Sequence, residues 1–323
     1  MRHTAVRAAL VLGLSGAAWC QPVPAERGVD LAARGRCAEA MPLLEKARGH
    51  VDDKDLKRSV GTAGVRCAMT LNDKAAATMF INWLDREFPH DAEVLYLSIH
   101  VYSDLSLRAS QELMYSAPAS PQVHQLNAES LETQGKVKEA MDEYRIVLQR
   151  APDMHGIHFH IARLMLSQPM TPTTLADARK ELEAELKIDP RNAGAEYVLG
   201  ELDRQADQLP GAIEHFARAT RLDAGFGDAF LSLGRTLLES DKVAEAVGPL
   251  ETAVKLQPDN PTVHFTLGTA YQRLGRQQDA AREFALHKST TEKARQASEA
   301  VRQGISGGPP QGAPPVQQGP PTH

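Results

Sequence analysis

The chain has 323 residues, which is enough for two globular domains or for one elongated array of small units. Hydrophobic residues make up 42% of the chain and aromatic residues only 5%, a composition that favours helices packed through small side chains over a β-rich core. The 36 basic and 41 acidic residues give a net charge of −5 and form no basic stripe, which argues against binding to nucleic acid or to an anionic membrane.

Residues 1–20 have the three parts of a secretory signal. Basic residues precede an apolar run from Ala8 to Ala18, which is too short to cross a bilayer. Cleavage after Ala18 or after Cys20 satisfies the small-residue rule, and cleavage after Cys20 is favoured because Ala18 then lies three positions before the cut. The alternatives are an uncleaved anchor and acylation of Cys20, which Trp19 disfavours. We expect export to the periplasm or the extracellular space, with envelope attachment if the signal is retained or lipidated.

Residues 21–120 are expected to form degenerate helical hairpins over 21–54, about 55–91 and 92–120, obtained by counting backward from the regular units that follow. Cys37 falls in the second helix of the first hairpin, and Cys67 falls in the first helix of the next. A solenoid packs these two helices together, and an oxidising compartment favours a disulfide between them. Two buried thiols are the alternative.

Residues 121–294 carry a sequence period of 34. It is marked by three Leu-Gly pairs, Leu199-Gly200, Leu233-Gly234 and Leu267-Gly268, and by an alanine series, Ala212, Ala246 and Ala280. The units are 121–154, 155–192, 193–226, 227–260 and 261–294, and the second contains four extra residues between its helices. Within a unit, apolar residues spaced three and four apart indicate two helices joined by a turn. The period therefore predicts an all-α solenoid of about eight hairpins over residues 21–294.

Two segments follow the array. Thr290 to Arg302 is expected to be a polar helix that caps the stack, with 295–303 as its end. Gly304 to His323 has six Pro, five Gly and no charged residue, a composition that cannot form a core, so a disordered tail is expected.

The period, the Leu-Gly pair, the central alanine and the proline at the unit end, as in Pro152 and Pro190, resemble the tetratricopeptide repeat. The resemblance is close over residues 121–294 and loose over 21–120. The family has an aromatic residue at the fourth position of each unit, and here only Phe230 fits. The other four units have His124, His158, Glu196 and His264 at this position.

The resemblance implies a right-handed superhelix in which the first helices line a concave groove. It also implies that groove residues occupy the second, fifth, ninth and thirteenth positions of each unit, which form one helical stripe. An aromatic ladder flanked by arginines suits an extended peptide or a partner helix, although the aromatic residues could instead cover neighbouring helices. Transferred by position, the groove contains Gln125, Glu129, Phe159, Arg163, Tyr197, Glu201, Leu231, Arg235, Phe265, Thr269 and Arg273.

The sequence offers little for chemistry. His155, His158 and His160 form a cluster, but no cysteine, carboxylate or zinc-hydrolase pattern completes a metal site. Asp189 and Asp223 lie at unit ends, where short acidic side chains favour turns and caps. No nucleophile motif or phosphate-binding glycine loop is present, so neither a catalytic residue nor a cofactor is expected.

These features predict a non-enzymatic scaffold that binds a protein or peptide partner in the concave groove. The sequence leaves open a binding protein for glycan or peptidoglycan in envelope assembly, and a regulatory subunit of an enzyme. It does not identify the partner or the oligomeric state.

Overall fold

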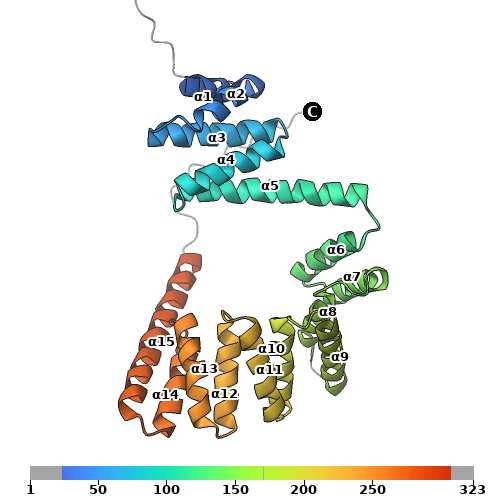
Figure 1. Ribbon diagram of the computed structural model, residues 1–323, viewed down its shortest axis with the longest axis vertical. Coiled ribbons are helices and arrows are strands. Elements are labelled where there is room, and N and C mark those ends of the chain that lie inside the picture. The colour runs from blue at the N-terminus through green and yellow to red at the C-terminus, as the bar shows by residue number, and fades with distance from the viewer. Residues whose placement is uncertain (1–23, 170, 307–323) are drawn as a thin grey trace, which may run out of the picture. The chain divides into compact units, whose positions relative to one another are not determined.

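The computed structural model describes residues 24–169 and 171–306, and all regular secondary structure within them is helical. The chain divides into two compact units, Met1–Pro118 and Ala119–His323 (Figure 1). The predicted all-α fold of stacked hairpins is confirmed. The expected signal at 1–20 and most of the expected tail, residues 307–323, lie outside the described residues. None of the described helices is both long enough and apolar enough to cross a bilayer.

Unit 1 contains two hairpins followed by a single long helix. Its helices are α1 (Pro24–Ala33), α2 (Cys37–Ala47), α3 (Lys54–Thr70), α4 (Lys74–Glu87) and α5 (Ala92–Ser116). They share one core, in which Phe80 and Trp83 of α4 have the largest buried side chains. The hairpin predicted at 92–120 is wrong, because α5 is one helix of 25 residues. No glycine or proline interrupts α5, so the chain has no turn there.

Unit 2 contains five successive hairpins, α6–α7, α8–α9, α10–α11, α12–α13 and α14–α15. The second helix of each hairpin contacts the first helix of the next, and the buried residues form successive clusters along the stack. The helices are α6 (Pro121–Thr133), α7 (Val137–Arg150), α8 (Ile157–Leu166), α9 (Pro172–Ile188), α10 (Ala193–Gln205), α11 (Leu209–Leu222), α12 (Gly227–Glu239), α13 (Val243–Leu256), α14 (Pro261–Arg273) and α15 (Gln277–Ser306).

The last helix, α15, corrects the predicted capping helix. It runs without interruption for 30 residues, so Thr290 to Arg302 is its continuation and not a separate element. Every residue from 291 to 300 is exposed, so this stretch extends past the packed hairpin instead of covering it. The helix also includes residues 304–306, which the sequence assigned to the disordered tail.

The turn inside a hairpin uses one backbone conformation in six hairpins, all except α8–α9, whose connection is longer. One residue in it has a positive φ of 57–73°, and that residue is Gly, Asn or Asp, the types that adopt the left-handed region at least cost. In this way the turn ends the first helix and starts the second after three residues. The residues are Gly35, Asn72, Gly135, Asp207, Asp241 and Gly275.

The Leu-Gly pairs of the 34-residue period mark a close approach of two helices. A Cβ atom on Gly200 would lie 2.7 Å from the Phe216 ring, and one on Gly268 would lie 2.7 Å from the Phe284 ring. Gly234 stands in the same relation to Leu250. The eighth position of these units is therefore glycine because the large side chain of the second helix occupies the space of a methyl group.

A histidine and a glutamate face each other across four of the five hairpins of unit 2. The pairs join the fourth position of the repeat to a position 19 residues later, or 23 residues later in the repeat with four extra residues. In the hairpin α10–α11 the order is reversed, with the glutamate on the first helix and the histidine on the second. Nδ1 of the histidine lies 2.5–2.8 Å from a carboxylate oxygen in His124–Glu143, His158–Glu181, Glu196–His215 and His264–Glu283.

A buried carboxylate replaces the missing cap of α8. Gly156 precedes this helix with a φ of 83° and has no side chain to cap it. Oε1 of the fully buried Glu185, on α9, accepts hydrogen bonds from the Gly156 amide at 2.7 Å and from Nδ2 of Asn192 at 3.2 Å. A negative charge at a helix N-terminus is favourable. Glu185 therefore anchors the start of α8 to α9 and, through Asn192, to the start of α10.

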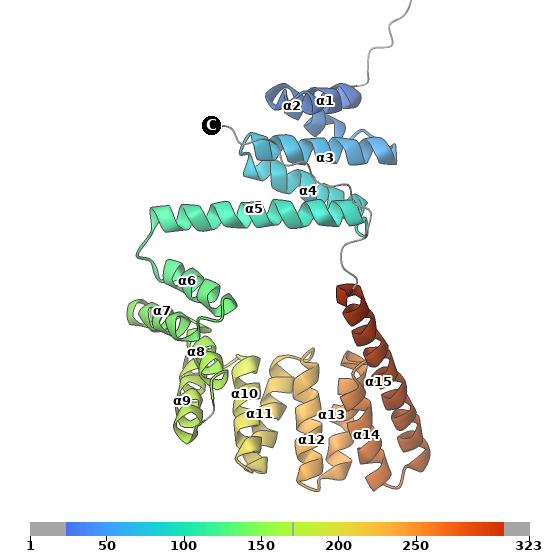
Figure 2. The ribbon, with the colours of Figure 1, turned by 180° about the vertical axis from the view of Figure 1, so that it is seen from behind.

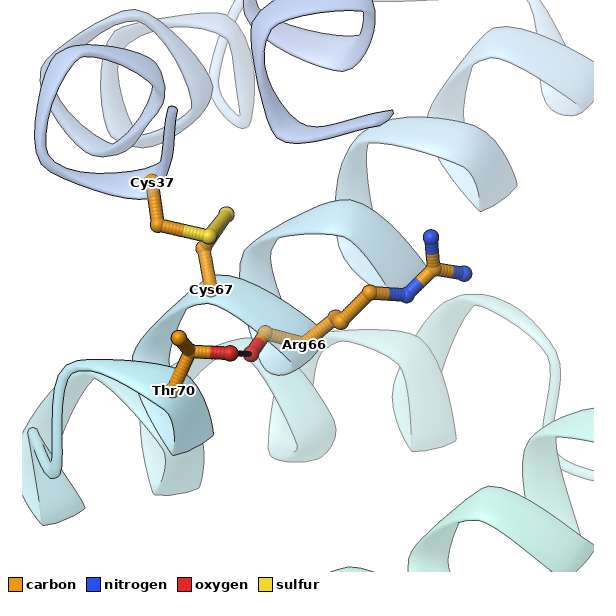
Figure 3. The surroundings of a disulfide bond; sticks show 4 residues. All are labelled: Cys37, Arg66, Cys67 and Thr70. Carbon is orange, nitrogen blue, oxygen red and sulfur yellow. Dashed lines mark hydrogen bonds between the residues drawn. A yellow bond between two sulfur atoms is a disulfide. The ribbon is translucent and has the colours of Figure 1, made fainter. Parts of the chain in front are cut away.

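A disulfide bond joins Cys37 of α2 to Cys67 of α3 (Figure 3). The two Cα atoms are 4.9 Å apart, and both residues are buried in the core of unit 1. The bond therefore links the first hairpin of unit 1 to the second.

Candidate functional site

The predicted groove residues lie on the first helices of the five hairpins of unit 2, namely α6, α8, α10, α12 and α14. First helices also contact one another directly, α10 with α12 and α12 with α14. Side chains from successive hairpins therefore meet on one side of unit 2, which we call the first-helix face. Figure 2 shows α10, α12 and α14 succeeding one another along this unit.

Two of the three predicted ladder aromatics are half-buried. The Phe159 ring packs onto the start of α10, because a Cβ atom on Gly194 would lie 2.9 Å from its tip. The Tyr197 ring centroid lies 5.7 Å from that of Phe216 and 4.9 Å from that of Phe226. Burial in this cluster raises the pKa of the Tyr197 hydroxyl above its usual value. Both rings thus cover neighbouring helices, which was the alternative that the sequence left open.

The next two apolar positions differ sharply from each other. Leu231 is buried, with 8% of its surface exposed, and belongs to the core. Phe265 is 51% exposed, although its ring lies 5.9 Å from Phe284 and 5.4 Å from His287. One side of the Phe265 ring therefore packs on α15, and the rest faces solvent.

Phe265 lines a hollow of about 330 Å³ between α12 and α14. The Thr266 hydroxyl donates to the Thr262 carbonyl at 2.7 Å, and the Thr269 hydroxyl donates to the Phe265 carbonyl at 2.9 Å. Because these donors are used within the helix, the hollow presents mainly carbon atoms and two opposite charges. The full lining is Arg235, Leu238, Glu239, Thr262, Phe265, Thr266 and Thr269.

Three of these lining residues, Arg235, Phe265 and Thr269, were predicted from the sequence as groove residues, and the other four were not. Thr262 and Glu239 hold the second and thirteenth positions of their units, so the same register could have found them. Leu238 and Thr266 stand beside that stripe and enter the hollow only because α12 and α14 are adjacent. That adjacency is a property of the packed array and not of one repeat.

The charged groove positions mostly connect one hairpin to the next. Arg163 pairs with Glu132 at 3.0 Å, and its guanidinium lies 5.9 Å from the Phe159 ring centroid. Arg273 donates to the Leu238 carbonyl at 2.8 Å and also pairs with Asp241. These arginines therefore have neighbouring partners already, which reduces what they could contribute to a ligand.

The polar groove residues of α6 and α10 also have hydrogen-bond partners within the protein. Nε2 of Gln125 donates to Glu129 at 2.9 Å within α6. Glu201 accepts from the Ser232 hydroxyl at 2.7 Å, across to α12, and from Arg204 at 2.8 Å. These contacts fix side-chain orientations on the first-helix face before any ligand arrives.

The three clustered histidines do not converge. His158 faces Glu181 inside its own hairpin, whereas His160 stacks on Tyr144 with the ring centroids 5.0 Å apart. Over residues 24–169 and 171–306, no three histidine, cysteine or carboxylate side chains come together in a way that could hold a metal ion.

The protein-family comparison identifies the type of repeat. A model of the family described as TPR repeat, the tetratricopeptide repeat, matches residues 234–275, which run from α12 to the turn after α14. This match confirms the resemblance to the tetratricopeptide repeat over residues 234–275. A search of curated proteins found no match.

Solved structures with a similar fold include MamA, at 22% identity and a TM-score of 0.47, covering 52% of this chain and 96% of MamA. A second is YrrB, described as a TPR protein with an unusual peptide-binding site, at 15% identity and a TM-score of 0.48, covering 60% of this chain and 98% of YrrB. A third is MamA 41-end from Desulfovibrio magneticus RS-1, at 15% identity and a TM-score of 0.47, covering 54% of this chain and 96% of that one.

Proposed function

We propose that this protein, which contains tetratricopeptide repeats, is a non-enzymatic scaffold that binds a protein or peptide partner on the first-helix face of unit 2. The observation that carries the proposal is the half-exposed ring of Phe265 beside the hollow between α12 and α14. The hollow accepts one apolar side chain of the partner, which serves as the anchor.

The energetics favour such an anchor. Burying one large apolar side chain contributes roughly 1.5–3 kcal/mol, and a few buried anchors account for most of the binding energy at protein interfaces. Phe265 and Leu238 supply the apolar wall, while Arg235 and Glu239 supply charges of both signs. A partner segment with an apolar residue flanked by polar ones would satisfy both features.

The test uses short random peptides displayed on phage and selected on the full chain. Synthetic versions of the selected peptides are then titrated against wild type, Phe265→Ala and a control, Leu256→Ala. Leu256 is 40% exposed on α13, a second helix, so it matches the exposure of Phe265 away from the proposed site.

We expect Phe265→Ala to weaken binding by roughly tenfold, equivalent to about 1.4 kcal/mol, and Leu256→Ala to change it by less than about twofold. Both variants should remain folded, with the far-ultraviolet circular dichroism of wild type, although Phe265→Ala loses its packing on Phe284. Selected peptides that bind Phe265→Ala as tightly as wild type would overturn the assignment of the anchor.

We also propose that the protein works in an oxidising compartment outside the cytoplasm. The Cys37–Cys67 bond supports this, because disulfides persist mainly in secreted and periplasmic proteins. The signal features of residues 1–20 agree with it. Cell fractionation, combined with thiol alkylation before denaturation, tests the proposal. Recovery of the chain in the cytosol with both cysteines alkylated would contradict it.

A further inference from the structure

The helix that ends unit 1 has one side without a packing partner in its own unit. In both views α4 lies along one side of α5, and no helix of unit 1 lies along the other (Figures 1 and 2). Val94, Ser98 and Val101 are buried on the packed side, where the Ser98 hydroxyl donates to Asp85 of α4 at 2.6 Å. In a hairpin array the opposite side would be covered by a second helix, which α5 lacks.

The open side of α5 is strongly apolar. Five large apolar residues on it expose between 44% and 66% of their surfaces: Leu95, Tyr96, Ile99, Leu107 and Met114. Tyr102, which is 42% exposed, lies at its edge, where its hydroxyl donates to Asn82 of α4 at 2.9 Å. The charged residues of the helix, Glu93, Asp104, Arg108 and Glu112, all lie at other positions around its axis. A patch of this kind on a helix 25 residues long marks an interaction surface.

The pattern of this open side is self-complementary. Two ridges of residues spaced four apart run along it, Leu95-Ile99-Ser103-Leu107 and Tyr102-Ser106-Ser110-Met114. A two-fold axis placed midway between residues 104 and 105 exchanges one ridge with the other. It sets Leu95 opposite Met114, Leu107 opposite Tyr102, and the larger Ile99 opposite the smaller Ser110.

At the centre of the crossing, Ser103 of one copy meets Ser106 of the other, and both are exposed serines. Small residues at the crossing point allow two helices to approach closely, and no charge on either ridge opposes the pairing. We propose that this open side of α5 is the interface of a symmetric homodimer, in which two copies of α5 cross antiparallel.

The exposed apolar area on the open side of α5 is sufficient for a dimer interface. At about 200 Å² for a fully exposed large side chain, the five residues and Tyr102 present roughly 600 Å² per copy, so a symmetric pair buries on the order of 1,200 Å² in total. This is the lower end of the range of specific, stable interfaces, which predicts an association that depends on concentration in the micromolar range. The same patch on both copies is the usual arrangement of a two-fold dimer.

The first test is sedimentation velocity of the full chain over a series of concentrations. Ile99→Asp puts a charge at the centre of the patch, on a residue that is 63% exposed and makes little contribution to the core of its own unit. Tyr115→Asp is the matched control, because Tyr115 is on the same helix and 88% exposed but lies off both ridges.

Wild type and Tyr115→Asp should form a dimer as concentration rises, and Ile99→Asp should weaken dimerisation by at least about tenfold. A wild-type chain that stays monomeric at every concentration, or a dimer that Ile99→Asp does not weaken, overturns the proposal. Binding of a different protein to the patch while the wild-type chain stays monomeric overturns it as well.

The second test probes the crossing geometry in a Cys20→Ser background. The double variant S103C/S106C, which sets a cysteine of one copy opposite a cysteine of the other, should give a covalent dimer under mild oxidation, which reductant reverses. Ser116→Cys, on the same exposed helix but off the ridges, should give none. Equal cross-linking of the two variants would contradict the antiparallel crossing, even if the chain is dimeric.

Discussion

Gly234 and Gly275 are both required by the fold, for different physical reasons. Gly234 has no space for a Cβ atom because the Leu250 side chain lies against it, whereas Gly275 has open space but a φ of 73°. Residues equivalent to Gly275 in the two preceding hairpins are Asp207 and Asp241, also with positive φ. The chain thus shows that the position of Gly275 accepts another residue, whereas the positions equivalent to Gly234 in the neighbouring hairpins, Gly200 and Gly268, are glycine as well.

We predict that Gly234→Ala lowers the free energy of unfolding of unit 2 by about 1–3 kcal/mol, because the added methyl group overpacks the contact with Leu250. Gly275→Asn should cost less than about 1 kcal/mol, since asparagine tolerates the left-handed region. Urea unfolding followed by far-ultraviolet circular dichroism measures both values. A neutral Gly234→Ala would mean that Leu250 can move aside.

At the scale of helices, the histidine–glutamate pairs fix the relative position of the two helices of a hairpin. The pair survives the four-residue insertion in 155–192, where its separation grows from 19 to 23 residues, so the insertion does not shift the packed register. Because the order is reversed at Glu196–His215, the array accepts either order.

The reversal leads to a prediction for His124 and Glu143. His124→Glu alone places two carboxylates in contact, and we expect a loss of about 1–3 kcal/mol. The double variant H124E/E143H restores the pair in the order found at 196/215 and should recover most of that loss. Urea unfolding of the wild type, both single variants and the double variant gives the coupling energy. A double variant as unstable as the sum of the singles would show that the two side chains act independently.

The same pairs show where sequence reasoning stopped. The residues at the fourth position, such as His124 and Glu196, depart visibly from the family pattern, but the repeat period does not indicate that each has a partner 19 residues later. Likewise, residues 92–116 and 277–303 contain no glycine or proline, which indicates two long helices. The repeat period instead predicts a hairpin in the first segment and two separate helices in the second. A period predicts spacing, whereas the ends of a helix depend on local residues.

At the scale of the whole molecule, the disulfide lies within unit 1 and so should stabilise that unit alone. Trp83 is the only tryptophan after residue 20 and is buried in unit 1, which makes its fluorescence a reporter for this unit. Replacing both cysteines, C37A/C67A, should lower the free energy of unfolding of unit 1 by about 3–4 kcal/mol, because a loop closed over a separation of 30 residues is released.

The measurement compares the Trp83 transition with circular dichroism during urea unfolding. The transition reported by Trp83 should move to lower urea, and the remainder of the dichroism change, from unit 2, should not move. A shift of both transitions by the same amount would show that the two units unfold together, which would contradict the prediction that the bond stabilises unit 1 alone.

The regular hairpins of unit 2 could be predicted from sequence because each repeat carries its own signals of period, turn and close contact. The site could be predicted only in part. Phe159, Tyr197 and Phe265 hold equivalent positions, yet only Phe265 is largely exposed, because Gly194 and Phe226 of adjoining segments receive the other two rings. Exposure is decided by the neighbouring hairpin, which the register of one repeat does not describe.

The exposed end of α15 has a consequence for motion. From 291 to 300 the amides are protected by bonds within the helix alone, and an isolated helix shorter than about 12–15 residues is marginal in water. These turns therefore open and close again while the hairpins stay folded, and their amides exchange with deuterium long before those of α14, whose Val263 and Leu267 are buried. Unit 2 consequently has no sharp boundary in this direction, because its order decreases turn by turn along a single helix.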